Sequence, residues 1–457
     1  MEYILLAIFV IGYVGIALEH KIKVDKAASA LLTGTLLWGL FAIGYHEVPA
    51  HLVEMFSNFS ADGGHSSLSV FYEHRLLHHM EEISSILFFL LGAMTIVELV
   101  DAHEGFRVIT DKINTNSKVK LMWIICILTF FFSAALDNLT TSIVMISLLK
   151  KLIDDKETRW LFAGMVVISA NAGGAWSPIG DITTTMLWIG GQLSTSAIIV
   201  NLILPSIVAM IVPLGILSFR LKGTVDRPIY NIEPSIDPTT SFERNIVFTV
   251  GVCGLLFVPV FKTVTHLPPF MGMMLSLGVI WILTERLHYS KNHEHRSELS
   301  VVGVLRKIDT SSVLFFLGIL LAVAALQEAG HLIFAATYLR EALNDVYLID
   351  LSIGLLSAIV DNVPLVAASM GMYDIEPINS VTLADEWATA FTKDGHFWQF
   401  LAYCAGTGGS VLIIGSAAGV AVMGLERIDF IWYLKKISLL ALAGYFAGAG
   451  VYLLMFA

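Results

Sequence analysis

Apolar stretches of about twenty residues recur along the whole chain and limit what it can fold into. A helix of that length crosses the roughly 30 Å hydrocarbon layer of a bilayer. Of the 457 residues, 56% are hydrophobic and 14% are charged, whereas soluble domains carry roughly 25% charged residues. The sequence therefore predicts an all-α polytopic membrane protein, and no basic stripe suggests a nucleic-acid partner.

Two of the apolar stretches carry the same polar pair in their middle. The first pair is Asp137-Asn138, and the second is Asp361-Asn362, 224 positions later. An ionisable residue at membrane depth is costly, so by default it marks a functional site. A single buried Asp could instead be a satisfied helix cap. Matching pairs in the two halves of a chain are typical of a transport site.

The surroundings of the first pair define a first predicted repeat, residues 1–222. It contains a helical hairpin at 119–153 that carries the Asp-Asn pair at its tip. A broken helix follows at 160–190, where glycines and a proline interrupt the apolar stretch. Residues 223–242, which contain three prolines, are the predicted cytoplasmic linker to the second half.

The second repeat, 243–457, presents the same elements in the same order. Its hairpin is predicted at 347–373 and its broken helix at 397–424. In both broken helices a Gly-Gly pair is followed by another glycine six positions after the second of the pair. The shared order and near-constant offset argue for an internal duplication.

The distribution of positive charge predicts how the chain is oriented. If each Asp-Asn stretch is a re-entrant hairpin, each half crosses the bilayer five times, and the two halves have inverted topology. With the N-terminus outside, all but four of the 27 Lys and Arg residues lie on the cytoplasmic side, as the positive-inside rule requires. We therefore expect a multi-pass protein of the cell inner (plasma) membrane with both termini outside. The hairpins would enter from opposite faces.

Two connecting segments are less apolar. The segment 45–82 is a predicted polar loop, and 101–118 is a predicted amphipathic helix at the membrane interface. Histidine titrates in the physiological range, so the loop could sense pH, or its histidines could simply be solvated. These histidines are His46, His51, His65, His74, His78 and His79.

The hairpin tips are predicted to form a cation site. A helix that stops at a tip leaves backbone groups unpaired, which is tolerable only inside protein or beside water. Helical spacing places Ser133 and Thr141 on the face of Asp137, and Ser357 on the face of Asp361. Carboxylates, hydroxyls and carbonyls are hard oxygen ligands suited to a small cation. Asp137 and Asp361 are the predicted sodium ligands, and Asn138 and Asn362 accompany them.

The broken helices supply the opposite wall of the predicted site. Their glycines could serve only close helix packing, but polar side chains surround them. Ser416 occupies the place in the second repeat that corresponds to Asp181 in the first. The candidate site residues on this wall are Asn171, Ser177, Asp181, Thr183, Thr407 and Ser410.

No Lys or Arg falls within the predicted midplane stretches. An anionic substrate would normally meet a fixed cation there, so acids without one favour a cationic substrate. A site that holds either a cation or protons, but not both, gives coupled exchange. We therefore expect a cation and protons to compete for Asp137, Asp181 and Asp361.

Four motifs resemble NhaD-type sodium/proton antiporters of the ion transporter superfamily, and the similarity covers nearly the whole chain. It implies secondary active exchange of Na⁺ or Li⁺ for H⁺ without a cofactor. It also implies a homodimer and an elevator movement of the hairpins and broken helices. The motifs are Ser133–Thr141, Ser169–Thr184, Asp361–Pro364 and Gly406–Ser410.

In carboxylate-carrying relatives the tips bear Ser-Asn-Thr-like motifs, and here Asp137 and Asp361 take the Ser places. The departure agrees with a cationic substrate. The alternative is an oxyanion (arsenite) or carboxylate permease on the same scaffold. The chain has no HExxH or GxSxG motif, so we expect a transporter and not an intramembrane enzyme.

Overall fold

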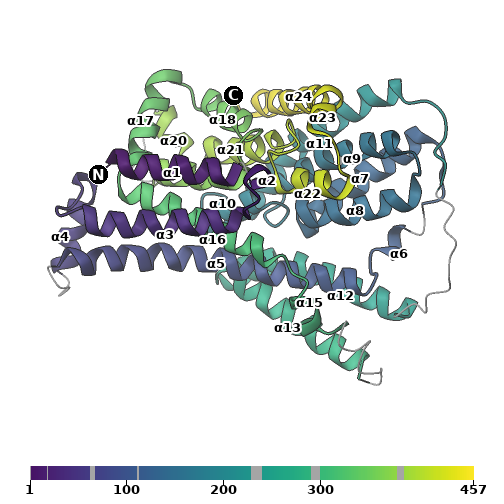
Figure 1. Cartoon of the computed structure of the whole chain (residues 1–457), viewed down its shortest axis with the longest axis horizontal. Coiled ribbons are helices and arrows are strands. Elements are labelled where there is room, and N and C mark those ends of the chain that lie inside the picture. Colours follow the sequence, from purple (N-terminus) through teal and green to yellow (C-terminus); the bar gives the residue numbers. More distant parts are fainter. Residues whose placement is uncertain are drawn as a thin grey trace.

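The computed structural model is built from helices (Figure 1) and describes residues 2–17, 19–61, 67–110, 113–227, 239–289, 299–377 and 385–457. Within these ranges, eight helices are long and apolar enough to cross a membrane. The predicted class of an all-helical polytopic membrane protein is confirmed. His65 and residues 228–238 of the predicted linker lie outside the described residues.

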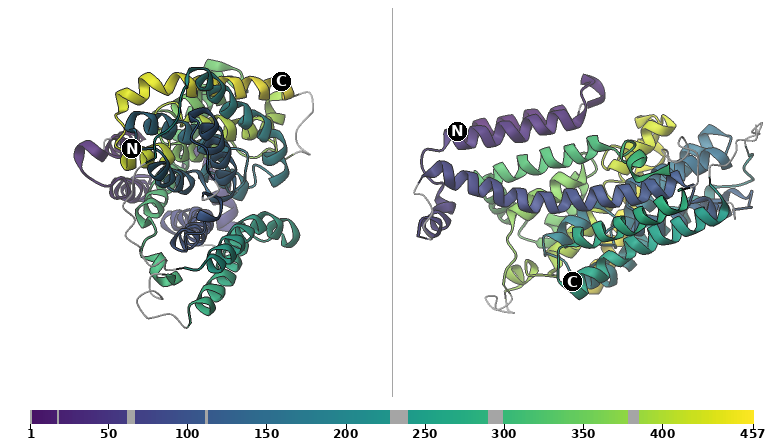
Figure 2. Two further views of the ribbon diagram at one scale, coloured as in Figure 1. Left: turned by 90° about the vertical axis from the view of Figure 1, so that its right-hand side faces the viewer. Right: turned by 90° about the horizontal axis from the view of Figure 1, so that it is seen from below.

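The helices form two groups, of which group A contains six. Its helices α3 and α16 pack along each other, and α5 packs on both α13 and α16. Helix α1 lies at the edge of the group, against α3 (Figure 2). The members are α1 (Glu2–Ala17), α3 (Lys26–Gly44), α5 (Leu68–Ala102), α12 (Ser241–Thr265), α13 (Pro269–Leu287) and α16 (Thr310–Glu328).

Group B contains the Asp-Asn motifs and the broken helices. Its main packing pairs are α11 with α24, α7 with α9, α18 with α21 and α22 with α8. The members are α7 (Lys118–Leu136), α8 (Asn138–Leu152), α9 (Lys156–Gly174), α10 (Ile182–Ile189), α11 (Thr195–Arg220), α18 (Val346–Leu356), α19 (Asn362–Met372), α21 (His396–Gly408), α22 (Ala417–Glu426) and α24 (Ser438–Phe456).

Shorter helices connect these elements. Helix α17 contacts α16 of group A as well as α18 and α19 of group B, so it lies between the groups. The connecting helices are α2 (Glu19–Ile22), η1 (Ala50–Leu52), α4 (Val53–Ala61), α6 (Arg107–Thr110), α15 (Val301–Leu305), α17 (His331–Leu343), α20 (Glu386–Ala390) and α23 (Phe430–Lys436).

The prediction of a polar loop at 45–82 is wrong. The segment contains α4, and α5 begins at Leu68, which makes α5 35 residues long. Phe71, Tyr72 and His79 are buried along this extension, and the Tyr72 ring lies 4.8 Å from the ring of Phe41 on α3. A hydropathy window misses such a helix because packing on one face stabilises it while the other face stays polar.

The predicted interfacial helix at 101–118 is also wrong over most of its length. Helix α5 ends at Ala102, and α6 spans only four residues. The chain before α7 instead pairs with the chain after α11: Ser117 forms an antiparallel bridge with Thr224, and Val225 N donates to Asn116 O at 2.8 Å. This partner is more than a hundred positions away in sequence, so local amphipathicity could not reveal it.

Close backbone approaches hold group B together at corresponding places in its two halves. A Cβ at Gly173 would overlap the carbonyl of Phe130, and a Cβ at Gly408 would overlap the carbonyl of Gly354. Phe130 and Gly354 are 224 positions apart, as the two Asp-Asn pairs are. Only glycine lets the helix arms approach this closely.

Candidate cation site

The first Asp-Asn pair lies where one helix ends and the next begins. Asp137 separates α7 from α8 with φ 93° and ψ 158°, a backbone conformation that is almost restricted to glycine. Its carboxylate accepts hydrogen bonds from Thr140 N at 2.7 Å and Thr140 Oγ1 at 2.8 Å. Asp137 therefore caps α8 and holds a strained turn.

The second pair makes a different turn. Helix α18 ends at Leu356, and α19 begins at Asn362. Asp361 precedes α19 with φ −50° and ψ 138°, an ordinary extended conformation. Pro364 stands in the first turn of α19, where its missing N–H would have no helical partner.

The two asparagines converge on one carboxylate, that of Asp181, which caps α10. Asn138 Nδ2 donates to Asp181 Oδ2 at 2.7 Å, and Asn362 Nδ2 lies 3.3 Å from the same oxygen. All three residues are buried: Asn138 is 4% exposed, Asn362 is 3% exposed and Asp181 is 2% exposed. Hydrogen bonds to a buried carboxylate are the stronger, charge-assisted kind, so Asp181 joins both tips.

Asn171 extends this network across the broken helices. Its side-chain oxygen accepts from Asn138 Nδ2 at 3.1 Å, and its Nδ2 donates to Ser410 Oγ and Ser416 Oγ, both at 2.9 Å. We call these buried residues the central cluster. Its members are Asn138, Asn171, Asp181, Asn362, Ser410 and Ser416.

Two predicted serines fix the hairpins to the broken helices. Ser133 Oγ donates to the carbonyl of Ala170 at 2.5 Å, and Ser357 Oγ donates to the carbonyl of Ala405 at 2.9 Å. The two contacts are related by the same offsets as the close approaches of Gly173 and Gly408. These hydroxyl protons are therefore committed to backbone carbonyls in this structure.

The remaining predicted hydroxyls lie around the cluster. Ser177 Oγ donates to Ala134 O at 2.5 Å, and Thr407 Oγ1 donates to Tyr403 O at 2.6 Å. Thr183 contributes its backbone N–H to Asp181 Oδ1 at 3.0 Å. The buried Thr141 hydroxyl has no hydrogen-bond partner among the described residues.

A small cavity of about 30 Å³ lies beside the first tip. Asp137, Thr140 and Asp181 line it from group B, and Ser312 and Phe316 line it from α16 of group A. A cavity of this size accommodates one water molecule or a small ion. Two of the three predicted carboxylates therefore face the same enclosed space.

The prediction that no cation opposes the acids is wrong for Asp361. Lys26 Nζ lies 3.9 Å from Asp361 Oδ2, with side chains 21% and 17% exposed. Lys26 is the first residue of α3, and its Nζ also lies 4.5 Å from the ring centre of Phe315. The sequence places Lys26 at the end of a span, and only the packing of α3 on α16 brings it to the second tip.

The neighbouring Asp25 anchors this end of α3. Its carboxylate accepts from Ser311 Oγ at 2.7 and 2.8 Å and from Ala27 N at 2.8 Å. The hydrogen bonds from Ser311 and then Ala27 hold the pKa of Asp25 below its usual range. Asp25 therefore stays charged beside Lys26.

Comparison with known proteins identifies the family. A family model described as citrate transporter matches residues 13–391. Sodium/proton antiporter 1 of Arabidopsis thaliana is 47% identical over 447 residues, which cover 98% of this chain and 71% of that protein. Sodium/proton antiporter 2 of the same plant is 45% identical over 451 residues, 98% of each chain.

A bacterial relative extends the similarity. The Na⁺/H⁺ antiporter NhaD of Halomonas elongata is 30% identical over 483 residues, covering 99% of this chain and 88% of its own. The chain belongs to the NhaD-type antiporter family of the ion transporter superfamily. As a member of that family it is a multi-pass membrane transporter and not an enzyme.

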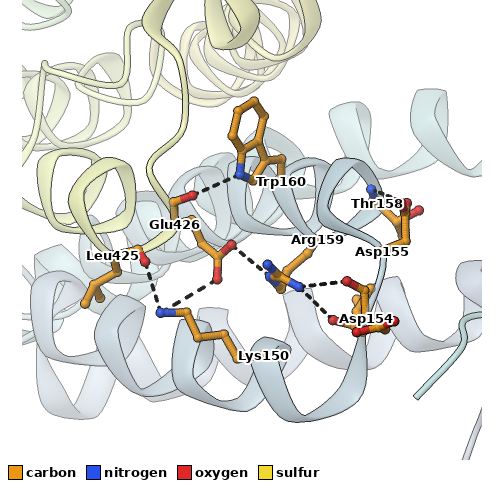
Figure 3. Close-up of polar contacts among 9 residues, drawn as sticks. Lys150, Asp154, Asp155, Thr158, Arg159, Trp160, Leu425 and Glu426 are labelled. Atoms are coloured by element: carbon orange, nitrogen blue, oxygen red, sulfur yellow. Dashed lines mark hydrogen bonds and ion pairs between the residues drawn. The ribbon is translucent and has the colours of Figure 1, made fainter. Parts of the chain in front are cut away.

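A second polar cluster ties the helices of this antiporter-family protein together at one end of group B (Figure 3). Glu426, the last residue of α22, accepts from Arg159 Nε at 2.8 Å, and its carboxylate lies 4.0 Å from Lys150 Nζ. Trp160 Nε1 donates to the Glu426 carbonyl at 3.0 Å. Lys150 also caps the Leu425 carbonyl at 3.0 Å, so α8, α9 and α22 are joined.

The opposite end of group B has its own junction. Asp394, just before α21, donates its backbone N–H to Gln192 O at 2.8 Å and accepts from Ser194 N at 2.6 Å. Asp394 is 235 positions after Arg159, the same offset as that between Gly173 and Gly408. Corresponding residues thus link the two halves at both ends.

A cavity of about 860 Å³ separates parts of the two groups. Group A lines it from α5, α16 and the α12–α13 connection, and group B lines it from α10 and α19. Arg75 and His79 on its wall bind the buried Glu328 carboxylate at 2.6 and 2.8 Å. Lys262 reaches from α12 to the Trp188 carbonyl at the end of α10, at 2.6 Å.

Proposed function

We propose that this antiporter-family protein exchanges Na⁺ or Li⁺ for H⁺, with the cation and protons competing for the carboxylates at the central cluster. The convergence of Asn138 and Asn362 on Asp181 carries the proposal, because it brings both tips and a broken helix to one buried acid. The relatives named as sodium/proton antiporters support the same substrate.

The side-chain amides allow two states of the site. An amide carries two N–H donors and one carbonyl oxygen. In this structure the N–H groups of Asn138 and Asn362 stabilise the Asp181 carboxylate. A cation at Asp181 would replace these donors, and rotation of each amide would offer it an oxygen. A proton on Asp181 removes the charge that attracts the cation, so the two ligands exclude each other.

We propose that the chain forms two repeats of inverted topology, 1–222 and 243–457, joined by a linker at 223–242. Each contains a re-entrant hairpin and a discontinuous helix. The matched contacts of Ser133 and Ser357 support this interpretation, since each serine donates a hydrogen bond from its predicted hairpin to the corresponding broken helix.

We also propose that group B moves as one body against group A in an elevator-type exchange. The junctions at Glu426 and Asp394 hold group B together at both ends. The 860 Å³ cavity between parts of the two groups is a space that water and ions could enter. In this proposal the chain lies in the plasma membrane with both termini outside, an orientation that the basic residues of the loops favour, and group A provides the homodimer contact.

The test is proton movement in vesicles. The purified full-length chain is reconstituted with a pH-sensitive dye inside, and Na⁺, Li⁺ or K⁺ is added outside. We expect Na⁺ and Li⁺ to drive proton release in a saturable manner, with K⁺ much less effective. Absence of cation-driven proton movement in vesicles that contain folded protein would contradict the proposal.

Citrate or a related carboxylate is the second candidate substrate. The family model carries the description citrate transporter, and Lys26 beside Asp361 supplies a cation that an anion could use. Labelled citrate added to the same vesicles separates the candidates. Citrate uptake without Na⁺-driven proton release would transfer the assignment to carboxylate transport.

A further inference from the structure

Asp350 is a buried acid that the central cluster does not use. It lies on α18, the first arm of the second hairpin, where α18 packs on α21 (Figure 1). Its side chain is 0% exposed. Neither carboxylate oxygen has a hydrogen-bond partner among the described residues, and no ion pair within them includes Asp350.

A carboxylate charge in this place would be very costly. An unpaired ionised carboxylate is strongly disfavoured in an apolar interior, so such a group takes a proton or a cation. No described side chain hydrogen-bonds to Asp350, so none is in place to complete a coordination shell for a cation there. A proton is therefore the ligand that suits Asp350.

The titratable groups that interact electrostatically with Asp350 are all weak acids. Cys404 comes from α21, Tyr445 and Tyr452 come from α24, and Tyr347 shares α18 with Asp350. Tyr373, at the end of α19, is also among them. The Tyr445 hydroxyl donates to the carbonyl of the neighbouring Leu351 at 3.0 Å. On α17, Arg340 is directed to the Trp387 ring at 4.7 Å. No described side chain supplies a fixed positive charge to Asp350.

The first repeat shows that packing alone does not require an acid here. The residue 224 positions before Asp350 is Cys126, which is also buried. Cys404, which faces Asp350, is 235 positions after Ser169, and Ser169 faces Cys126. Equivalent helix arms therefore pack around a neutral thiol in one repeat and around a carboxyl group in the other.

Tyr373 both lines the large cavity and lies within electrostatic range of Asp350. Tyr373 lines the 860 Å³ cavity, and its hydroxyl has no hydrogen-bond partner among the described residues. An unpaired buried hydroxyl costs free energy unless water or another group satisfies it. Tyr373 thus combines a place on the cavity wall with an electrostatic interaction with Asp350.

We propose that Asp350 is a second proton-binding site of the exchanger, loaded from the large cavity past Tyr373. This inference rests on the proposed Na⁺/H⁺ exchange. A proton from cavity water forms an O–H bond with a carboxylate oxygen of Asp350, and the reverse step returns it to water. Group B then carries this proton separately from the ligand of the central cluster.

The test compares Asp350→Asn with the wild type and with Asp350→Cys, which introduces the side chain of the first repeat. In reconstituted vesicles, the number of protons exchanged per Na⁺ is determined from the membrane potential at which flux stops. We expect both variants to exchange one proton fewer per Na⁺. Tyr373→Phe should slow proton loading and leave the ratio unchanged. An unaltered ratio in a folded Asp350 variant would overturn the proposal.

Infrared difference spectroscopy provides a readout that does not depend on transport. A pH step applied to the wild-type protein with isotope-labelled aspartate should change a carboxyl band that Asp350→Cys lacks. If wild-type vesicles show no Na⁺-driven proton release but this band titrates, the exchange proposal fails and the proton site stands. If no buried carboxyl band of the wild type responds to pH, the Asp350 proposal fails by itself.

Discussion

The two hairpin tips share the Asp-Asn sequence but use its first residue differently. Asp137 holds a strained turn at φ 93°, caps α8 and lines the small cavity. Asp361 holds an ordinary turn at φ −50° and lies 3.9 Å from Lys26. The asparagines, in contrast, do the same thing in both tips, since each donates to Asp181.

The asparagine side chains therefore act alike at the two tips, whereas the aspartate side chains have different surroundings. The first tip contributes an acid free of any basic partner among the described residues. The second contributes an acid whose charge Lys26 partly balances. Both tips contact the Asp181 carboxylate, whereas Asp137 and Asp361 each belong to a single tip. Variants of Asp137 and Asp361 therefore test the two tips separately.

Replacing the shared carboxylate should have the largest effect. Asp181→Asn removes the charge that both asparagines bind, and the loss of a buried charge network typically costs several kcal/mol. We expect Na⁺-driven proton flux to fall by about 100-fold or more. Asp154→Asn, at an exposed position after α8, is the control. Flux within a few-fold of the wild type in Asp181→Asn would remove Asp181 from the site.

Replacing each asparagine by alanine should show which tip contributes more to Na⁺ binding. Asn138 makes two hydrogen bonds, at 2.7 and 3.1 Å, whereas Asn362 makes a longer contact at 3.3 Å. Leaving a buried partner unsatisfied costs about 1–3 kcal/mol. We expect Asn138→Ala to raise the half-saturating Na⁺ concentration about tenfold and Asn362→Ala to raise it less. Asn201→Ala, outside the cluster, should leave it unchanged, and the reverse ranking would contradict the comparison.

Removing the positive charge at the second tip should have a smaller effect. A partly exposed pair at 3.9 Å is worth up to about 1 kcal/mol, so Lys26→Met should change the half-saturating Na⁺ concentration by a factor of about five or less. We expect tighter Na⁺ binding, because Lys26 no longer competes for Asp361. Lys23→Met is the matched control.

A double-mutant comparison sharpens this prediction. Lys26→Met combined with Asp361→Asn should be non-additive, whereas Lys26→Met combined with Asp137→Asn should be additive, since distant sites act independently. Equal coupling to both acids would show that Lys26 acts on the whole site and not on one tip.

The sequence predicts the helical membrane class and its apolar spans because both depend on composition and on the length of apolar runs. It places helix ends poorly where polar residues are packed on one face, as at Phe71 and His79 on α5. There the apolar signal is weak, and tertiary contacts with α3 decide the conformation.

For the candidate site, the motifs identify residues that the structure brings together, including Asn138, Asn171 and Asp181. The sequence alone misses Lys26 and Asp350. Lys26 reaches Asp361 only through the packing of α3 on α16. Asp350 lies near the end of an apolar stretch, where a sequence reading takes it for a polar residue outside the membrane. Depth and partners depend on three-dimensional packing.

The last expected effect is on stability and concerns the backbone of the two tips. Asp137→Gly should relieve a conformation that costs a non-glycine residue about 1–3 kcal/mol, while a glycine replacing a helix cap loses only a few tenths. Asp361→Gly relieves nothing and makes the unfolded chain more flexible, at a cost of about 0.4–1 kcal/mol. We expect the thermal midpoint in detergent to stay level or rise for Asp137→Gly and to fall for Asp361→Gly. Asp309→Gly, at the α16 cap with φ −69°, should behave like Asp361→Gly. A midpoint that falls equally in all three variants would show that the first tip stores no strain, and the two turns would then differ in shape alone.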